Sequence, residues 1–306
     1  MHCVESYSGL GLTPIPIPDR VPQDLARKRV YFMCQFCKDY GEGKKWYLLP
    51  KNYSQERYKE VGAKDKIIHH VEHFEEDMTT GLGFSEKLRL TDPVTFQEML
   101  PMMQEQQRKL MWGQIILLQE AEQILDMAVK IVRLPCLCRS MLLGRSDCMF
   151  EFGFFMFESK DKTYEGYPGY SEHSSAVTKD EAKRLLRDFE EQGMIHTIWT
   201  FCTPYIVCMC NCTAADCVPV KIRAQSGMSS VCKGEYVGRI DLGKCTGCRE
   251  CIKTCNFGSI SYSTTLKKCY IDEYKCTGCG LCYSRCPESA VVLTDRNTMP
   301  ELAGVW

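Results

Sequence analysis

Eight cysteines toward the C-terminal end of the sequence repeat one spacing twice. Residues 245–255 read CTGCRECIKTC and residues 276–286 read CTGCGLCYSRC, so each stretch places its cysteines as C-x2-C-x2-C-x3-C. Three thiolates spaced in this way let a tight loop reach three iron corners of a cuboidal 4Fe-4S cluster. Gly247, Gly278 and Gly280 would allow the loop backbone to turn closely. Structural zinc sites would need only the C-x2-C pairs, which leaves the third and fourth cysteines of each stretch unexplained.

The fourth cysteine of each stretch lies too far along the chain to complete its own cluster, so it is expected to bind the other one. The expected ligands of the first cluster are Cys245, Cys248, Cys251 and Cys286. The expected ligands of the second cluster are Cys276, Cys279, Cys282 and Cys255.

Residues 236–294 resemble a bacterial-type dicluster ferredoxin domain. Short apolar strands precede the two motifs in YVGRIDLGKC and KKCYIDEYKC, and others follow them in FGSISYS and PESAVVLT. The resemblance implies two hairpins and two short helices that hold two 4Fe-4S clusters and pass one electron at a time. The family usually has proline after the fourth cysteine of both motifs, whereas Asn256 follows Cys255 here. This departure should alter a turn, but it removes no ligand.

The composition limits where such a protein would work. The 306 residues carry a net charge of −1, with 38 basic and 39 acidic side chains, which argues against nucleic acid as the main partner. The N-terminal sequence has no apolar signal region, and no apolar run approaches the roughly 18 residues of a transmembrane helix. We therefore expect a cytoplasmic protein whose 21 cysteines are reduced and available to metal.

Thirteen cysteines lie outside the two motifs, and most of them gather in two segments. Residues 135–148 contain three and residues 201–217 contain five. Cysteines two residues apart on an extended strand face the same way, so the two segments could meet and supply four thiolates. Such a set would bind a third 4Fe-4S cluster or zinc, and the alternative is that these cysteines are buried apolar residues. The expected ligands are Cys136, Cys138, Cys148 and Cys210, with Cys212 as the rival for the last position.

Residues 135–217 also resemble a group of little-characterised cysteine-rich dicluster proteins from anaerobes. Those proteins carry a C-x-C-R segment, a helix and a short cysteine-rich run before a ferredoxin domain. The resemblance implies no assigned reaction.

The remaining cysteines carry weaker signals. Cys34 and Cys37 form a C-x2-C pair that would suit half a zinc site or a redox pair. No second C-x2-C pair lies nearby in the sequence, so they are expected to be core or interface thiols. Cys3, Cys232 and Cys269 are isolated and are expected to be structural.

The expected fold class is α+β, with the dicluster ferredoxin domain appended to a larger, mainly helical N-terminal region that includes a small β-hairpin. Asp92-Pro93 starts a helical pattern, Pro101 interrupts it, and a long helix is then expected to run to about Ile131. A second helix is expected at about 179–192, between the capping box of Thr178 and Glu181 and the stop at Gly193. Two β-type runs joined at Thr203-Pro204 follow, and this helix and hairpin weakly resemble part of a winged-helix unit.

Composition shifts suggest five regions. They are a Pro/Gly/Tyr-rich docking region at 1–91, a helical and hairpin domain with the third cysteine group at 92–222, a linker at 223–235, the ferredoxin domain at 236–294, and a tail at 295–306.

These features favour an electron-transfer subunit of a larger anaerobic oxidoreductase complex over a catalytic chain. Its partner would be a redox protein or a catalytic subunit, and neither GLGFSE nor GEGKK matches a nucleotide-binding fingerprint. One alternative is a reductase whose N-terminal cluster binds substrate. A less favoured alternative is an iron–sulfur sensor that binds DNA through a winged helix.

Overall fold

The computed structural model describes residues 34–139, 148–152 and 174–302. Its contacts divide the chain into residues 1–31 and residues 32–306, so everything described belongs to the second unit. The proline-rich stretch at 14–18 and Cys3 lie outside the described residues. In the described ranges, no helix combines the length and the hydrophobicity that a membrane crossing requires.

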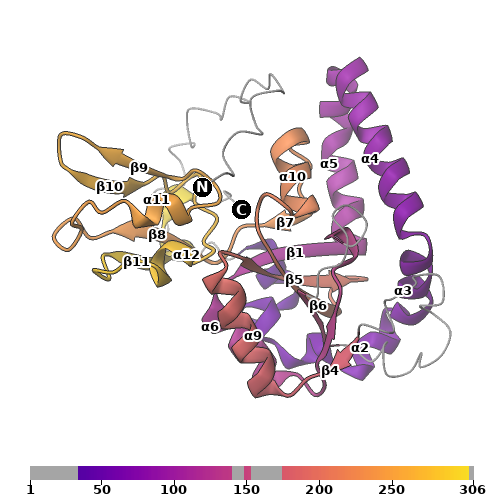
Figure 1. Cartoon of the computed structure of the whole chain (residues 1–306). Helices are drawn as coiled ribbons and strands as arrows, with labels where there is room; N and C mark the ends of the chain where they lie inside the picture. Colours follow the sequence, from indigo (N-terminus) through magenta and orange to yellow (C-terminus); the bar gives the residue numbers. More distant parts are fainter. Residues whose placement is uncertain (1–33, 140–147, 153–173, 303–306) are drawn as a thin grey trace. The chain divides into compact units, whose positions relative to one another are not determined.

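A seven-stranded mixed sheet organises the N-terminal part of this unit (Figure 1). The strand order is β4-β2-β3-β6-β5-β1-β7, and every pair is antiparallel except the parallel pair of β1 and β7. The strands are β1 (Met111–Ile116), β2 (Val132–Leu134), β3 (Met149–Glu151), β4 (Ser175–Ala176), β5 (Ile195–Phe201), β6 (Ile206–Cys212) and β7 (Val231–Cys232). The expectation of a mainly helical N-terminal region with one small hairpin is therefore wrong.

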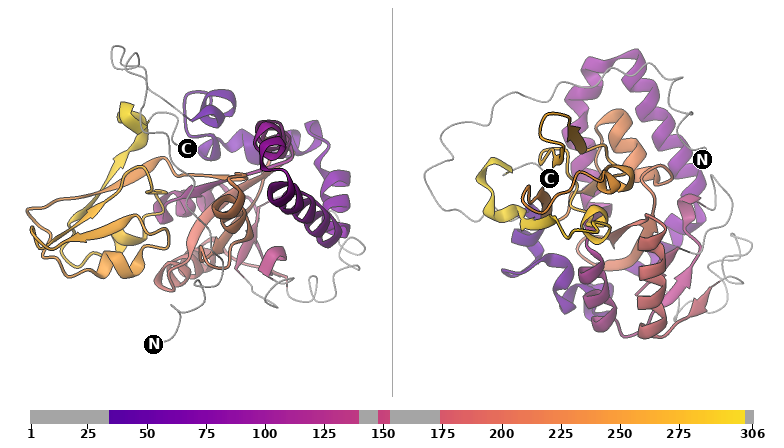
Figure 2. Two further views of the ribbon diagram at one scale, coloured as in Figure 1. Left: turned by 90° about the horizontal axis from the view of Figure 1, so that it is seen from above. Right: turned by 60° about the vertical axis from the view of Figure 1, so that its left-hand side comes forward.

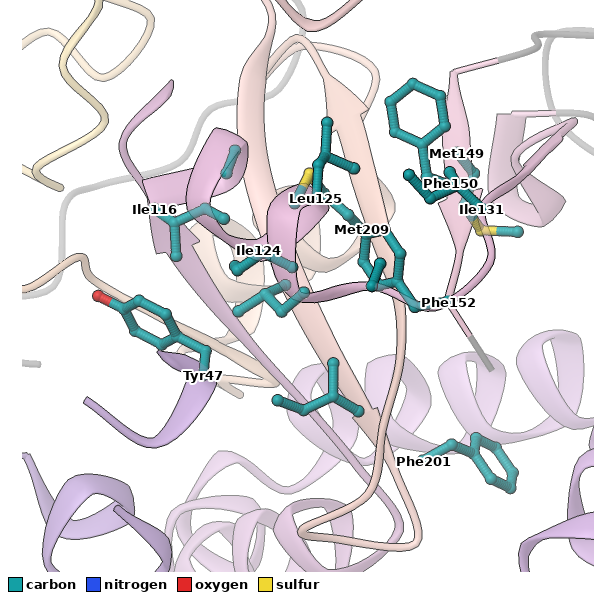
Figure 3. Close-up of a cluster of buried hydrophobic side chains, with 14 of the residues drawn as sticks. Tyr47, Ile116, Ile124, Leu125, Ile131, Met149, Phe150, Phe152, Phe201 and Met209 are labelled. Atoms are coloured by element: carbon teal, nitrogen blue, oxygen red, sulfur yellow. The ribbon is translucent and has the colours of Figure 1, made fainter. Parts of the chain in front are cut away.

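Helices surround this sheet. They are α1 (Gln35–Tyr40), α2 (Gln55–Glu60), α3 (Ala63–Glu72), α4 (Phe74–Thr91), α5 (Pro93–Leu110), α6 (Leu118–Met127), α9 (Lys179–Glu191) and α10 (Val218–Ser226), with short 3-10 turns η2 (Trp46–Leu48) and η3 (Pro50–Tyr53). Helices α4 and α5 pack side by side, as do α6 and α9 (Figures 1 and 2). The main core lies between α6, α9 and the sheet, where Ile124 and Leu125 lie beside Met209 of β6 (Figure 3).

The prediction of a long helix from Pro101 to about Ile131 is wrong. The start predicted at Asp92-Pro93 is confirmed, because the Asp92 carboxylate accepts a hydrogen bond from the Thr95 amide at 3.1 Å and caps α5. However, α5 continues through Pro101 and ends at Leu110, and β1 follows it at once. Tertiary pairing overrides the helical period here, because β1 bonds to both β5 and β7. Gly113 fits this strand closely, since a Cβ there would lie 2.8 Å from the Trp199 ring.

The prediction for the second helix is confirmed. The Thr178 hydroxyl accepts a hydrogen bond from the Glu181 amide at 3.2 Å and caps α9. Gly193 follows the helix end with a φ of +81°, where glycine is favoured. The hairpin of β5 and β6 is also present and turns at Thr203-Pro204. Both strands lie inside the sheet with a partner on each side, so the hairpin is not an exposed wing.

The C-terminal part has the two short helices that the resemblance implied and two antiparallel strand pairs, one of which, β9 with β10, is a hairpin. Strands β8 (Tyr236–Ile240) and β11 (Val291–Asp295) pair, as do β9 (Ile260–Ser263) and β10 (Lys268–Ile271). The helices are α11 (Glu250–Thr254) and α12 (Leu281–Ser284), and the turns η4 (Arg296–Thr298) and η5 (Pro300–Leu302) follow β11. The stretch 223–235, expected to be a linker, holds the end of α10 and strand β7.

Polar contacts join this C-terminal part to α9 and to the segment after β7. The buried Arg296 side chain donates to the carbonyl oxygens of Gly234 at 3.0 Å and Cys276 at 3.0 Å. The Ser284 hydroxyl donates to the Glu190 carboxylate at 2.8 Å. Because buried charged donors need such partners, these bonds fix the segment after β7 against the second cysteine motif.

Candidate functional site

A first cavity in the C-terminal part is lined by four of the motif cysteines. They are Cys245, Cys248, Cys251 and Cys286. The turn after β8 places Cys245, whose amide donates to the Asp241 carbonyl at 3.0 Å. Helix α11 contributes Cys251, and the chain after α12 contributes Cys286. Three cysteines of the first motif thus share a cavity with the last cysteine of the second.

A second cavity has the complementary lining. Its cysteines are Cys255, Cys276, Cys279 and Cys282. Cys255 follows the end of α11, and Cys282 belongs to α12. The two short helices therefore carry their cysteines into both cavities, and each cavity gathers three thiols from one motif and one from the other.

Backbone amides point at several of these sulfur atoms. The amide of Ala290 lies 3.2 Å from Cys286 Sγ, that of Gly238 lies 3.4 Å from Cys276 Sγ, and that of Ser259 lies 3.4 Å from Cys255 Sγ. Such N–H donors stabilise thiolates and tune the potential of an iron–sulfur cluster. The donor set thus fits iron-bound sulfur in both cavities.

Two glycines allow the cysteine loops to pack closely. Gly247 has a φ of +75° and Gly278 a φ of +76°. A Cβ atom would lie 2.3 Å from the Lys267 carbonyl oxygen at Gly247 and 2.1 Å from the Tyr236 carbonyl oxygen at Gly278. Any side chain would therefore push each loop away from the neighbouring backbone.

Burial changes how readily these thiols ionise. It raises the pKa of Cys251 and of Cys279 to about 12. Neutral thiols are the favoured state when no cation is near, so a positive centre is needed to hold them as thiolates. Iron supplies such a charge, and burial then shields the iron–sulfur bonds from water.

Two features of this part could not be read from the sequence: the position of Cys269 and the effect of Asn256. The isolated Cys269, expected to be only structural, lines the first cavity and is 1 % exposed. Its place on β10, just before the second motif, is the signal that could have revealed it. Asn256, the residue that replaces proline, donates from its side chain to the Gly193 carbonyl at 3.0 Å. The departure from the family pattern therefore makes a contact with the turn after α9.

A third, larger cavity of about 140 Å³ lies against the sheet. The cysteines that line it are Cys136, Cys138, Cys208, Cys210, Cys212 and Cys217. Three of these alternate along β6, as expected for residues on one face of a strand. Cys148 is buried nearby, and its sulfur lies 3.8 Å from an Arg139 guanidinium nitrogen. The two cysteine-rich segments therefore meet at one place.

The local structure of the first segment differs from the expected strand. Strand β2 ends at Leu134, and residues 137–139 are helical. Cys136 and Cys138 reach the third cavity from this strand-to-helix turn, so the argument from strand alternation does not apply to them. The structure brings them there because β2 pairs with β3, whose other neighbour is β6.

Cys217 is a residue of this cavity that the sequence did not single out. It sits at the N-terminal cap of α10, and a hydrogen bond from Cys212 lowers its pKa while the same contact raises that of Cys212. The backbone amide of Val220 adds to the stabilisation of the Cys217 thiolate. A cysteine at a helix N-terminus is typical of a thiolate that binds metal or reacts. The signal was the Val218-Pro219 start of the helix directly after it.

Comparison with known proteins locates one family in the chain. No curated protein and no solved structure matches it. A family model described as a 4Fe-4S dicluster domain matches residues 244–290, the stretch that contains all eight motif cysteines. The chain therefore carries a C-terminal 4Fe-4S dicluster domain, and such a domain implies two 4Fe-4S clusters.

Proposed function

We propose that the protein relays single electrons between a redox partner and its own N-terminal part. The two cavities of the dicluster domain carry this proposal, because each gathers four motif cysteines. One cluster would be held by Cys245, Cys248, Cys251 and Cys286, and the other by Cys276, Cys279, Cys282 and Cys255. The clusters supply the redox chemistry, and the chain supplies thiolates, amide donors and exclusion of water.

The exposure of the cysteines indicates which cavity would face a partner protein and which would face the sheet. Cys248 is exposed, whereas Cys245 and Cys251 in the same cavity are buried. The first cavity is therefore the natural contact point for a partner protein. On the other side, Cys279 of the second cavity packs against the apolar cluster around Leu281 and Trp199. Cys208 and Cys210 of the third cavity pack against this same cluster.

This shared packing supports a third metal centre as the next redox centre of the relay. The third cavity offers more thiols than one cluster needs, and soft thiolates select iron–sulfur clusters or zinc. We propose a third 4Fe-4S cluster held by Cys136, Cys138, Cys148 and Cys210, with Cys212 as the rival for the last position. The hydrogen bond from Cys212 lowers the pKa of Cys217, which makes Cys217 a further rival that the sequence did not suggest.

Metal analysis of the anaerobically purified full chain tests the proposal. About eight iron and eight sulfide per chain would indicate the dicluster domain alone, and about twelve of each would indicate the third cluster. Replacing Cys138 by Ser should then remove about four iron atoms and leave the EPR signals of the dicluster domain unchanged. The matched control is Cys202→Ser, because Cys202 is buried but does not line the third cavity. Twelve iron atoms in Cys138→Ser would refute this ligand set.

A reductase is the second candidate, and the lining of the third cavity favours it. Besides its cysteines, the cavity is lined by apolar side chains that include Met111, Leu134 and Trp199. Such a lining suits a small apolar substrate beside a cluster with one open iron position. EPR of the reduced protein distinguishes the two candidates, because a signal that shifts on adding a ligand such as cyanide indicates an open iron. A signal that does not shift supports a fully ligated relay cluster.

A further inference from the structure

Cys34 and Cys37 lie beside a carboxylate from a distant part of the chain. Cys34 caps α1, and its sulfur accepts a hydrogen bond from the Cys37 amide at 3.2 Å. The two sulfur atoms are 3.0 Å apart, and Cys37 Sγ lies 3.1 Å from Glu235 Oε1. The three residues are 4 %, 1 % and 1 % exposed, so this is a fully buried group of acids.

The three ligand atoms lie within 4.8 Å of one another. No other set of three Cys, His, Asp or Glu side chains in the described ranges meets that distance. Cluster-binding cysteines need not meet it, because the iron and sulfide atoms of a cubane hold the thiolates apart. The short spacing here suits a single ion instead. Around a tetrahedral zinc ion with Zn–S of about 2.3 Å and Zn–O of about 2.0 Å, ligand atoms sit about 3.5–3.8 Å apart.

A third cysteine lies close to Glu235 in the sequence. Cys232 is buried and is separated from Glu235 by two residues, as Cys34 is from Cys37. Its sulfur is not among the ligand atoms that lie within 4.8 Å of one another, so the site has three ligands from the chain. Three ligands leave one position of a tetrahedral ion open.

We propose that Cys34, Cys37 and Glu235 bind one divalent metal ion, with zinc as the preferred ion. The site is separate from the cavities of the dicluster domain and from the third cavity, since none of its residues lines them. Binding would replace the thiol protons of Cys34 and Cys37 by metal–sulfur bonds and release two protons, while Glu235 would bind as a carboxylate.

The surroundings of Glu235 orient it for this role. Gln114 Nε2 donates to Oε1 at 3.1 Å, and Asn297 Nδ2 donates to Oε2 at 2.8 Å. The Trp46 indole donates to Gln114 Oε1 and so fixes the amide that faces the carboxylate. Outer contacts of this kind hold a metal ligand in place and raise metal affinity.

The charge of the site also favours a cation. The contact with Cys34, burial and the Glu235 charge all raise the pKa of Cys37. The Cys37 contact lowers the pKa of Cys34, but burial and the Glu235 charge outweigh it and the pKa is raised. A bound divalent ion removes this mutual repulsion. A redox pair that exchanges with another protein would instead need an accessible sulfur, and both sulfurs belong to buried residues.

The metal would hold two segments together. These are the start of α1 and the residue directly before β8, the first strand of the C-terminal part. Through Asn297 the same site contacts η4 after the last strand. The ion would therefore tie both ends of the C-terminal part to α1.

The test is zinc and iron analysis of the full chain, purified anaerobically from cells supplied with zinc. About one zinc per chain is expected in addition to the iron. Glu235→Gln keeps the volume and both thiols, and should lower zinc affinity at least about tenfold without changing the iron content. Cys37→Ser should do the same, and Cys202→Ser is the matched control that should retain zinc. Glu235→Gln answers the question even where Cys37→Ser does not fold.

Three results would overturn the proposal. The first is a wild-type chain without zinc or another divalent ion beyond the cluster iron. The second is zinc that stays fully bound in Glu235→Gln and Cys37→Ser, which would place it at another site. The third is a mass lower by two hydrogens in the peptides of Cys34 and Cys37 after anaerobic alkylation, which would identify a disulfide redox pair. The iron content is measured in the same samples, so the metal site and the electron relay stand or fall separately.

Discussion

Leu281 of the dicluster domain and Trp199 of the central sheet pack in one buried apolar cluster. The first residue begins α12, which carries Cys282 of the second cavity, and the second lines the third cavity. This cluster joins the dicluster domain to the sheet through apolar side chains. It would stabilise the chain and shorten the path of the proposed electron relay.

Leu281→Ala should be strongly destabilising. Leu281 is buried, so the substitution loses apolar contacts and leaves a cavity, at a cost of about 2–5 kcal/mol in the free energy of unfolding. Urea unfolding followed by circular dichroism measures this. Leu266→Ala is the matched control, because Leu266 is an exposed leucine of the same domain and should change stability by less than about 0.5 kcal/mol. Equal effects of both variants would mean that the contact does not hold the domain.

The crossed lining of the two cavities predicts the outcome of double substitutions. Cys255→Ser should remove about four iron atoms, and adding Cys276→Ser should remove no more, because both cysteines line the second cavity. Combining Cys255→Ser with Cys245→Ser should remove about eight, because Cys245 lines the first. Iron analysis with EPR of the reduced proteins gives the answer. The reverse pattern would show that each motif binds its own cluster.

Gly278→Ala should damage the second cavity. The added Cβ would meet the Tyr236 carbonyl oxygen at 2.1 Å, so the loop before Cys279 must move. Gly258→Ala is a matched control, because Gly258 also has a positive φ but nothing lies within 4 Å of the added atom. The control should cost about 1 kcal/mol from backbone strain alone, and Gly278→Ala should cost well above that and lose iron. Full iron retention in Gly278→Ala would contradict this account of the loop.

His196 should make the protein less stable in acid. Its ring lies 2.6 Å from Asn211 Oδ1 in the core, and burial lowers its pKa to about 4. The unfolded chain, with an ordinary histidine pKa of about 6.5, binds the proton more readily, so stability falls as the pH drops from 6.5 toward 4. Between pH 7 and pH 5 the loss should be about 2 kcal/mol. Urea unfolding of wild type and His196→Gln at both pH values measures this loss in the free energy of unfolding. The same pH dependence in the variant would show that another group causes it.

Local signals allowed the dicluster domain to be predicted and failed for the sheet. The cysteine spacing, the strands beside it and the Thr178 cap of α9 all act within a few residues, so the sequence alone indicates them. No local sequence signal of this kind identifies strand β1. Its apolar residues fit a helical period, and only pairing with β5 and β7 makes them a strand.

The same distinction applies to the candidate sites. The eight motif cysteines stand out by spacing, and the gathering of the two other cysteine-rich segments could be foreseen because both are dense in sulfur. The cysteine spacing did not identify Cys217 and Cys269 as candidate site residues. Their positions at the cavities depend on a helix start for Cys217 and on a strand face for Cys269. Glu235 was missed entirely, because a glutamate becomes notable only when the fold places it against Cys37.

The crossed lining also sets the order in which the cavities can be completed as the chain is synthesised. The second cavity has its last cysteine, Cys282, before the first cavity has Cys286. The ribosome therefore delivers a complete set of thiols for the downstream motif before it does so for the upstream one. If these cavities hold the clusters as proposed, the first motif offers only three thiols until Cys286 emerges, and iron and sulfide would be delivered to the first cavity only after the second motif is made.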